Sequence, residues 1–130
     1  DGIHVGQEDM EAAKVRQRVG DDMMIGVSVH SVEEALEAVR NGADYLGVGA
    51  IYPTTTKVKT VLTSTETLGN ICRAVPIPVN AIGGLNKDNI DVLKGIPIAG
   101  ICVVSAIMKA ENPREAAVGL IEKAKELGLW

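Results

Sequence analysis

The sequence predicts an α/β fold built around a parallel sheet, and three observations lead to this prediction. Short apolar runs alternate with helical patterns about five times along the 130 residues. The apolar residues are Val, Ile, Leu and Ala, while aromatic residues make up only 2% of the chain. A single helical segment separates each run from the next. Buried parallel strands joined by crossover helices have this composition and this order.

The individual elements follow from local patterns. Aliphatic runs bounded by glycine, proline or polar residues predict strands. Apolar residues spaced three and four apart predict helices, and Ser31 with Glu34 matches the capping box that starts a helix ending at Asn41 and Gly42. The expected strands are 2–5, 23–28, 45–49, 79–82 and 100–104, and the expected helices are 9–18, 32–40, 66–74, 88–95 and 114–127.

Composition and charge exclude several classes of function. The net charge of −4 gives no basic surface for nucleic acid. No apolar run approaches the roughly 20 residues of a membrane span, and the start of the chain at Asp1 resembles no signal segment. Cys72 and Cys102 lie in an expected helix and strand, so we expect buried free thiols rather than a disulfide or a metal site. These features indicate a cytoplasmic protein.

Two architectures are compatible with a parallel α/β chain. One is the open doubly wound sheet, and the other is the TIM (β/α)₈ barrel. No glycine-rich phosphate fingerprint of the dinucleotide-binding kind follows a strand, which disfavours the first. A complete barrel typically needs roughly 200 or more residues. We therefore expect residues 1–130 to form a single domain that supplies part of a barrel.

Polar or glycine-rich segments follow every expected strand. In both architectures the carboxyl ends of the strands meet at one edge of the sheet, where ligands bind. The five segments should therefore converge on one site. They are residues 6–9, Ser28, residues 54–57, Gly83 with Gly84, and Ser105.

Several of these segments carry groups suited to a phosphate. Thr54, Thr55 and Thr56 offer hydroxyl donors, and Lys57 adds a point charge, although a solvated surface loop is the alternative reading. Gly83–Gly84 would let the backbone approach an anion, and the Val104 amide with Ser105 could do the same at the next strand end. Barrels commonly bind phosphate at the loops after strands seven and eight. If the segments at 83–84 and 104–105 are the loops after strands seven and eight, the chain supplies strands 4 to 8 of the barrel.

The other candidates have a structural alternative as well. Asp9 could ligate Mg²⁺ beside a substrate phosphate or could cap a helix. Ser28 could bind substrate or could bond its own backbone in a turn. His30 could act as an acid or base or could be a structural histidine, and the sequence leaves its role open. His4, inside an apolar strand, is expected to be packed.

The motifs resemble those of the thiamine phosphate synthase family, whose members are barrel enzymes. The similar segments cover nearly the whole chain in order, and their combination is specific. They are Gly-Ile-His-Val-Gly-Gln-Glu-Asp at 2–9, Ile-Gly-Val-Ser at 25–28, residues 42–57, Ala-Ile-Gly-Gly at 81–84 and Val-Val-Ser-Ala at 103–106.

The resemblance implies a transferase of thiamine biosynthesis. Hydroxymethylpyrimidine diphosphate would lose pyrophosphate with the assistance of Mg²⁺, and the nitrogen of thiazole phosphate would capture the resulting cation. Carried over residue by residue, Asp9 matches a Mg²⁺ ligand, and Ser28 and Lys57 match groups that hold the pyrimidine diphosphate. The expected thiazole phosphate site comprises Thr54, Thr55, Thr56, Gly84, Val104 and Ser105.

Two motifs of the family's amino-terminal half, a Gln…Lys pair and an Asn-Asp pair, do not occur in this chain. We therefore expect the chain alone to be incomplete for activity. Exposed strand edges would favour a homo-oligomer or pairing with a missing amino-terminal barrel segment. The alternatives are an enzyme resembling the thiazole tautomerases, which share the Gly-Val-Ser-Val-His-Ser pattern at 26–31, and a non-catalytic phosphate-binding module.

Overall fold

Five parallel strands form one sheet in chain order, β1-β2-β3-β4-β5, which confirms the expected α/β class. The computed structural model describes residues 1–57 and 59–130, so Val58, in the loop after Lys57, lies outside the described residues. β1 and β5 are the two edges of the sheet. The strands are β1 (Gly2–Val5), β2 (Met24–Val29), β3 (Tyr45–Val48), β4 (Val79–Ile82) and β5 (Gly100–Cys102).

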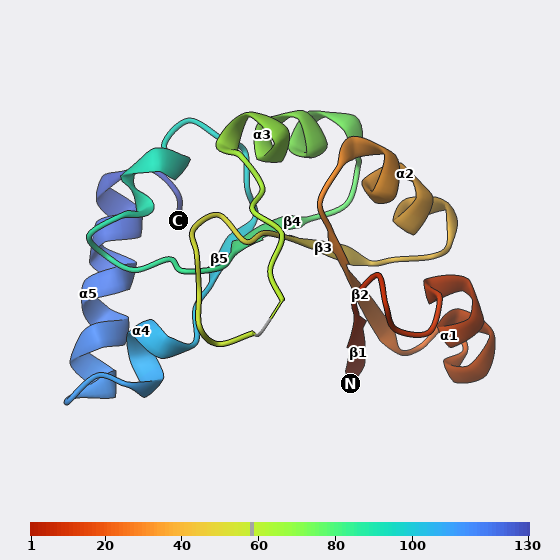
Figure 1. The fold of residues 1–130 in the computed structure, drawn as a ribbon, viewed down its shortest axis with the longest axis horizontal. Coiled ribbons are helices and arrows are strands. Elements are labelled where there is room, and N and C mark those ends of the chain that lie inside the picture. The colour runs from red at the N-terminus through yellow and green to blue at the C-terminus, as the bar shows by residue number, and fades with distance from the viewer. Residues whose placement is uncertain (58) are drawn as a thin grey trace.

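The helices lie in an arc around one side of the curved sheet (Figure 1). α1 and α2 pack on β2, and α3 packs on β4 and on α2. None of the helices within residues 1–57 and 59–130 combines the length and apolar character needed to cross a membrane. The helical elements are α1 (Ala12–Val19), α2 (Val32–Arg40), α3 (Thr65–Ala74), the 3₁₀ turn η1 (Ile90–Leu93), α4 (Ser105–Met108) and α5 (Pro113–Glu126).

The two faces of the sheet differ in character because side chains alternate along a strand. On β2, Ile25, Val27 and Val29 are buried against the helices. Gly26 and Ser28 lie on the opposite face. Fully buried Leu46, Val48 and Ala81 on β3 and β4, and Leu68 and Ile71 on α3, extend the same aliphatic core. The helices therefore cover one face and leave the other for polar side chains.

Two strands and one helix cap match the sequence prediction closely. The strands at 2–5 and 79–82 have the expected bounds. Ser31 is the N-cap of α2, and its hydroxyl accepts from the Glu34 N–H at 3.1 Å. The helix α2 also has the expected bounds, 32–40, and the remaining elements differ from theirs.

The first helix begins at Ala12 rather than at residue 9. The Asp9 carboxylate accepts from the Gly6 N–H at 2.7 Å, and the Asp9 N–H donates to the Gly6 carbonyl at 3.2 Å. These bonds close a turn across residues 6–9. The possibility that Asp9 caps the helix is therefore wrong, since the N-cap is Glu11.

The expected helix at 88–95 is only the 3₁₀ turn η1. The side chains of Asn86 and Asn89 form hydrogen bonds with backbone N–H groups in this segment. Asn89 Oδ1 accepts from the Asn86 N–H at 2.8 Å, and Asn86 Oδ1 accepts from the Asp88 N–H at 2.9 Å. Such local bonds compete with the helical pattern.

The last strand also ends earlier than expected, at Cys102 instead of residue 104. The chain turns there into the short helix α4, which the sequence did not predict. Cys102 is exposed rather than buried, because its side chain shares a face with its registered neighbour Ile82, itself 37% exposed. Cys72 is half-buried, and both cysteines are free thiols as expected.

Arg16 of α1 ties together the amino ends of β2 and β3. Its guanidinium donates to the carbonyls of Gly20, Met23 and Gly42 at 2.7–2.9 Å and to the Asp44 carboxylate at 2.6 Å. The same Asp44 oxygen accepts from the Ile25 N–H at 2.7 Å. The Ile25 amide and then the Arg16 guanidinium hold the pKa of Asp44 below its ordinary value of 3.8.

We predict that Asp44→Asn removes an acid-sensitive part of the stability. A carboxylate whose pKa is depressed by folding stabilises the native state above its unfolded pKa, and this contribution is lost as the pH falls through the folded pKa. The difference in unfolding free energy between the wild type and Asp44→Asn should therefore be constant above about pH 5 and shrink below about pH 4. Urea unfolding at several pH values measures it.

Asp22→Asn is the matched control, because it removes the same charge from a residue without a salt bridge among the described residues. A difference for Asp44→Asn that stayed unchanged between pH 6 and pH 3 would contradict the prediction.

Candidate functional site

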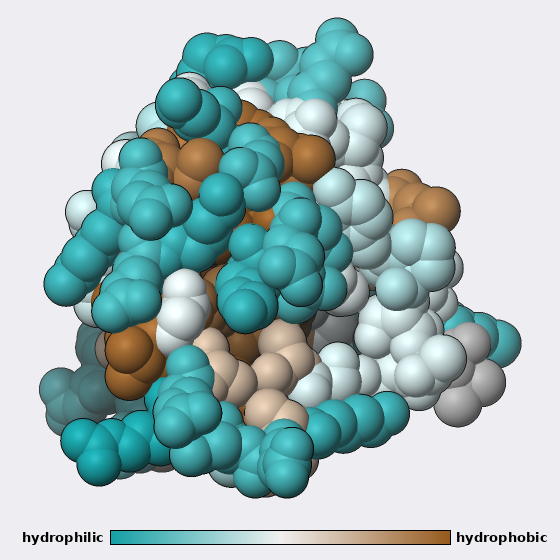
Figure 2. Space-filling view, turned by 90° about the vertical axis from the view of Figure 1, so that its left-hand side faces the viewer, coloured by the Kyte–Doolittle hydropathy of each residue, from teal (hydrophilic) through white to brown (hydrophobic). Residues whose placement is uncertain are grey.

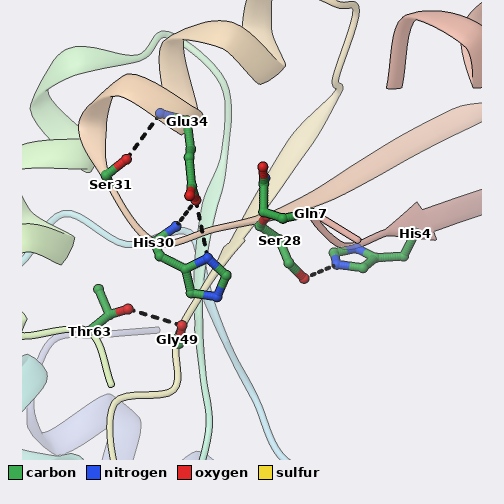
Figure 3. Close-up of polar contacts among 8 residues, drawn as sticks. All are labelled: His4, Gln7, Ser28, His30, Ser31, Glu34, Gly49 and Thr63. Atoms are coloured by element: carbon green, nitrogen blue, oxygen red, sulfur yellow. Dashed lines mark hydrogen bonds and ion pairs between the residues drawn. The ribbon is translucent and has the colours of Figure 1, made fainter. Parts of the chain in front are cut away.

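Ser28, a predicted substrate-binding residue, lies within β2 on the face that the helices leave open. Its hydroxyl oxygen is 2.8 Å from Nε2 of His4, and Nδ1 of His4 is 3.0 Å from the hydroxyl oxygen of Tyr45 (Figure 3 shows the His4–Ser28 contact). The expectation that His4 is packed inside an apolar strand is wrong, since His4 is exposed. Ser28 bonds to a neighbouring strand, not to its own backbone in a turn.

The charges of two further candidates act on His4. Although the residue as a whole is exposed, its ring is partly desolvated by its surroundings, and this is the largest influence; it lowers the pKa of His4 below its ordinary value of 6.5. The Asp9 carboxylate acts to raise this pKa, and the Lys57 ammonium acts to lower it. The loops after β1 and β3 therefore both place a charge within electrostatic reach of the imidazole that contacts Ser28.

Asp9 offers one carboxylate for a metal ion. It is exposed, and the turn bond to Gly6 uses one of its two oxygens. Among residues 1–57 and 59–130, no group of three or more His, Cys, Asp or Glu side chains is placed to hold a metal ion. Mg²⁺ keeps several waters and is often bound by one or two carboxylates together with substrate phosphates. Asp9 fits a ligand of such a shared site and does not form a closed site by itself.

The loop that carries residues 54–57 is fixed at its base. Ala50 exchanges backbone hydrogen bonds with Val61 and Thr63, both at 2.8 Å. The buried Thr63 hydroxyl donates to the Gly49 carbonyl at 3.0 Å (Figure 3). The described residues between these anchors, 51–57 and 59–60, extend over the open side of the sheet (Figure 1).

Within this loop the predicted phosphate-binding side chains are accessible. Thr54 is partly buried, whereas Thr55, Thr56 and Lys57 are exposed. The Thr54 hydroxyl accepts from the Thr56 N–H at 3.2 Å, which holds the backbone in a local turn. The exposure of these side chains agrees with the alternative of a solvated surface loop. The base of the loop, however, is held against the sheet by hydrogen bonds.

Gly83 and Gly84 bring the loop after β4 against the loop after β3. Both have a positive φ, +104° and +64°. An added Cβ on Gly83 would lie 2.5 Å from Cα of Ala50, and one on Gly84 would lie 2.7 Å from Cβ of Tyr52. The Tyr52 N–H donates to the Gly83 carbonyl at 3.0 Å. Only glycine permits this approach.

Val104 and Ser105 form the start of α4, with Val104 as its N-cap. A cavity of about 680 Å³ separates the loop after β4 from α4 and α5, and Figure 2 shows this side of the molecule, where hydrophilic residues surround a hollow. Gly84, Val104 and Ser105 do not line that cavity. The structure thus brings the loops after β3 and β4 into contact but gives no hydrogen bond between Ser105 and Gly84 among the described residues.

His30 is held by the first turn of α2. One oxygen of the Glu34 carboxylate accepts from the His30 N–H at 2.7 Å and lies 3.1 Å from His30 Nδ1. In Figure 3 the ring turns from this contact toward the side where Gly49 lies. The bond replaces the usual reciprocal bond of a capping box, in which the acid returns to the N-cap residue. This geometry agrees with the structural reading of His30.

Sequence reasoning missed three residues that shape this region. His4 contacts both Ser28 and Tyr45, and Thr63 anchors the loop after β3. A weak signal was available for His4 and Tyr45, since both are polar residues in otherwise aliphatic runs. Thr63 lies among several exposed hydroxyl residues, and nothing in the sequence marks it as the buried one.

Known proteins match both the fold and the sequence of this chain. A family model described as thiamine monophosphate synthase matches residues 1–107. A thiamine-phosphate synthase of Clostridium tetani is 50% identical over 116 residues, which cover 89% of this chain and 56% of that protein. One of Ruminiclostridium cellulolyticum is 50% identical over 122 residues, 94% of this chain and 58% of that protein.

A solved structure of thiamine phosphate pyrophosphorylase from Pyrococcus furiosus matches with a TM-score of 0.88 and 42% identity, over 98% of this chain and 60% of that chain. The fold is thus that of part of a TIM-barrel enzyme. The chain belongs to the thiamine monophosphate synthase family, which confirms the resemblance seen in the motifs. It spans a little more than half the length of the curated relatives it matches.

We predict that Thr63→Val loosens the loop after β3. The substitution keeps the volume but leaves the buried Gly49 carbonyl without its donor, which costs about 1–3 kcal/mol. The free energy of urea unfolding and faster cleavage of the loop in limited proteolysis would report the effect. Thr63→Ser retains the hydroxyl and is the control. Equal proteolysis rates for the Val and Ser variants would count against this anchor.

Proposed function

We propose that the complete protein containing this chain is a thiamine phosphate synthase, which couples hydroxymethylpyrimidine diphosphate with thiazole phosphate and releases pyrophosphate. The observation that carries the proposal is 50% identity to a thiamine-phosphate synthase over 89% of the chain. In this proposal residues 1–130 form one domain that supplies strands 4 to 8 of the barrel. As a step of thiamine biosynthesis, the reaction would take place in the cytoplasm.

The residue roles follow the chemistry of a departing pyrophosphate, which needs stabilisation of negative charge more than a general base. Ser28 and Lys57 hold the pyrimidine diphosphate, and Lys57 supports the pyrophosphate as it leaves. Both residues act on His4 in the structure, Ser28 by contact and Lys57 by charge, which supports a shared site. The strands and loops that carry them end at the same edge of the sheet.

The thiazole phosphate is assigned to the loops after β3, β4 and β5. Thr54, Thr55 and Thr56 supply hydroxyls, Gly84 exposes its backbone, and Val104 and Ser105 contribute from the start of α4. The packing of Gly83 and Gly84 against residues 50–53 supports a shared role for the loops after β3 and β4.

Mg²⁺ is the cofactor in this proposal, with Asp9 as its ligand from this chain. When bound, the ion would neutralise charge on the diphosphate and so favour its departure. The remaining ligands would be substrate oxygens, water and a carboxylate from outside this chain. The turn between Gly6 and Asp9 fixes the carboxylate before any ion binds.

We further propose that the two edges of the sheet, β1 and β5, pair with a missing amino-terminal barrel segment or with another copy of the chain. The expected result for the 130-residue chain alone is self-association without synthase activity. Light scattering after size-exclusion chromatography measures the first, and an assay with both substrates and Mg²⁺ measures the second. A monomer at micromolar concentration, or formation of thiamine phosphate, would overturn this part.

For the complete protein we predict that Lys57→Ala lowers kcat by about 100-fold or more, because a preorganised charge stabiliser is lost. The assay follows thiamine phosphate formation from both substrates with Mg²⁺. Lys59→Ala is the matched control, since it removes the same charge two residues further along an exposed loop, and it should remain near wild type. Near-wild-type turnover of Lys57→Ala would reject the site, and an inactive wild type would reject the function.

A further inference from the structure

The imidazole of His4 spans from β1 to β3 across the strand between them. Gly26 of β2 is in register with both His4 on β1 and Tyr45 on β3, so the three residues lie at one level of the sheet. Gly26 has no side chain, and an added Cβ would collide with the Tyr45 ring and with Nδ1 of His4. A Cβ on Gly47 would lie 3.3 Å from Cε1 of His4. Two glycines thus provide the room that the imidazole occupies.

The ring makes a polar contact at each of its nitrogens. Nδ1 is 3.0 Å from the Tyr45 hydroxyl oxygen, and Nε2 is 2.8 Å from the Ser28 hydroxyl oxygen. The centroids of the His4 and Tyr45 rings are 5.5 Å apart. Three side chains from three strands therefore form one continuous chain of hydrogen bonds, which ends at the residue assigned to the pyrimidine diphosphate.

We propose that His4 is a positioning residue that directs the proton of Ser28 toward a diphosphate oxygen. Tyr45 donates to Nδ1, the Nε2–H of the neutral imidazole donates to the Ser28 oxygen, and the Ser28 O–H remains available to the substrate. This inference rests on the proposed function, in which Ser28 binds the diphosphate.

The order of the protons follows from the chemistry of the ligand. A neutral imidazole has one N–H, and a serine has one O–H. If Nε2 accepted a hydrogen bond from Ser28, the hydroxyl would have only lone pairs left for the ligand. A diphosphate oxygen is itself an acceptor, so the two oxygens could not form a hydrogen bond. The reverse order gives the anion a donor, and hydrogen bonds to charged groups are the stronger ones. A diphosphate therefore selects the tautomer with the proton on Nε2.

The electrostatics favour the neutral imidazole that this order requires. Burial lowers the pKa of His4 below its ordinary value, which favours the neutral ring, while the Asp9 carboxylate and the Lys57 ammonium act in opposite directions. In the neutral ring, Tyr45 and Ser28 decide which nitrogen carries the proton.

A double-mutant cycle on the complete protein tests whether His4 acts through Ser28. His4→Asn should lower kcat about tenfold, in keeping with the loss of one hydrogen bond that serves a charged ligand. His4→Gln should retain most of the activity, because its amide nitrogen can reach the position of Nε2, whereas that of Asn reaches only the position of Nδ1. In a Ser28→Ala background, His4→Asn should have no further effect.

Urea unfolding of each variant identifies losses that come from misfolding. Equal losses for His4→Gln and His4→Asn in folded protein, or an undiminished effect of His4→Asn in the Ser28→Ala background, would overturn the proposal.

A second measurement is independent of synthase activity. In complete protein labelled with ¹⁵N-histidine, the ring nitrogen shifts of His4, assigned by their loss in His4→Asn, report the tautomer. Inorganic pyrophosphate should increase the share with the proton on Nε2 in the wild type, and Tyr45→Phe should reduce that share before pyrophosphate is added. A tautomer that responds neither to pyrophosphate nor to Tyr45→Phe would refute the role of His4. An inactive wild type that shows both responses would refute the synthase function alone.

Discussion

Parallel hydrogen bonding between strands that follow one another in the chain is the constraint on which the other features depend. Ser28 is in register with Gly47, and Gly26 with Tyr45, because β2 and β3 run side by side in the same direction. All five strands therefore end at one edge. A shift of one residue in β2 would turn Ser28 into the aliphatic core and expose Val27. Burial of that aliphatic face fixes the register and, with it, the position of every polar side chain on the open face.

Glycine lets this rigid frame bring polar groups together. At Gly26 the missing side chain lets a histidine reach over a whole strand, and at Gly83 and Gly84 it lets two loops touch. The loop with Lys57 gains its fixed base from backbone bonds at Ala50 and from the hydroxyl of Thr63, not from its own exposed residues. The geometry of the region thus depends as much on small and buried residues as on the charged ones.

The sequence predicted the features that depend on local pattern. Aliphatic runs gave the strands at 2–5 and 79–82, and the spacing of Ser31 and Glu34 gave the cap of α2. A feature that depends on contacts between distant residues was missed, because the short strand 2–5 does not reveal that His4 faces Ser28. One local feature was missed as well, since asparagine side-chain bonds replaced the expected helix at 88–95 with a 3₁₀ turn. The roles assigned to Thr54–Lys57, Gly84, Val104 and Ser105 remain predictions.

The network around Arg16 lies at the amino ends of β2 and β3, the opposite edge of the sheet from the polar loops. Its bonds go mainly to backbone carbonyls, so it constrains few of the side chains that a ligand would meet. Mutations that alter the loops and mutations that alter this network should therefore act almost independently. Such a separation lets residues of the loops be substituted while the scaffold keeps its stability.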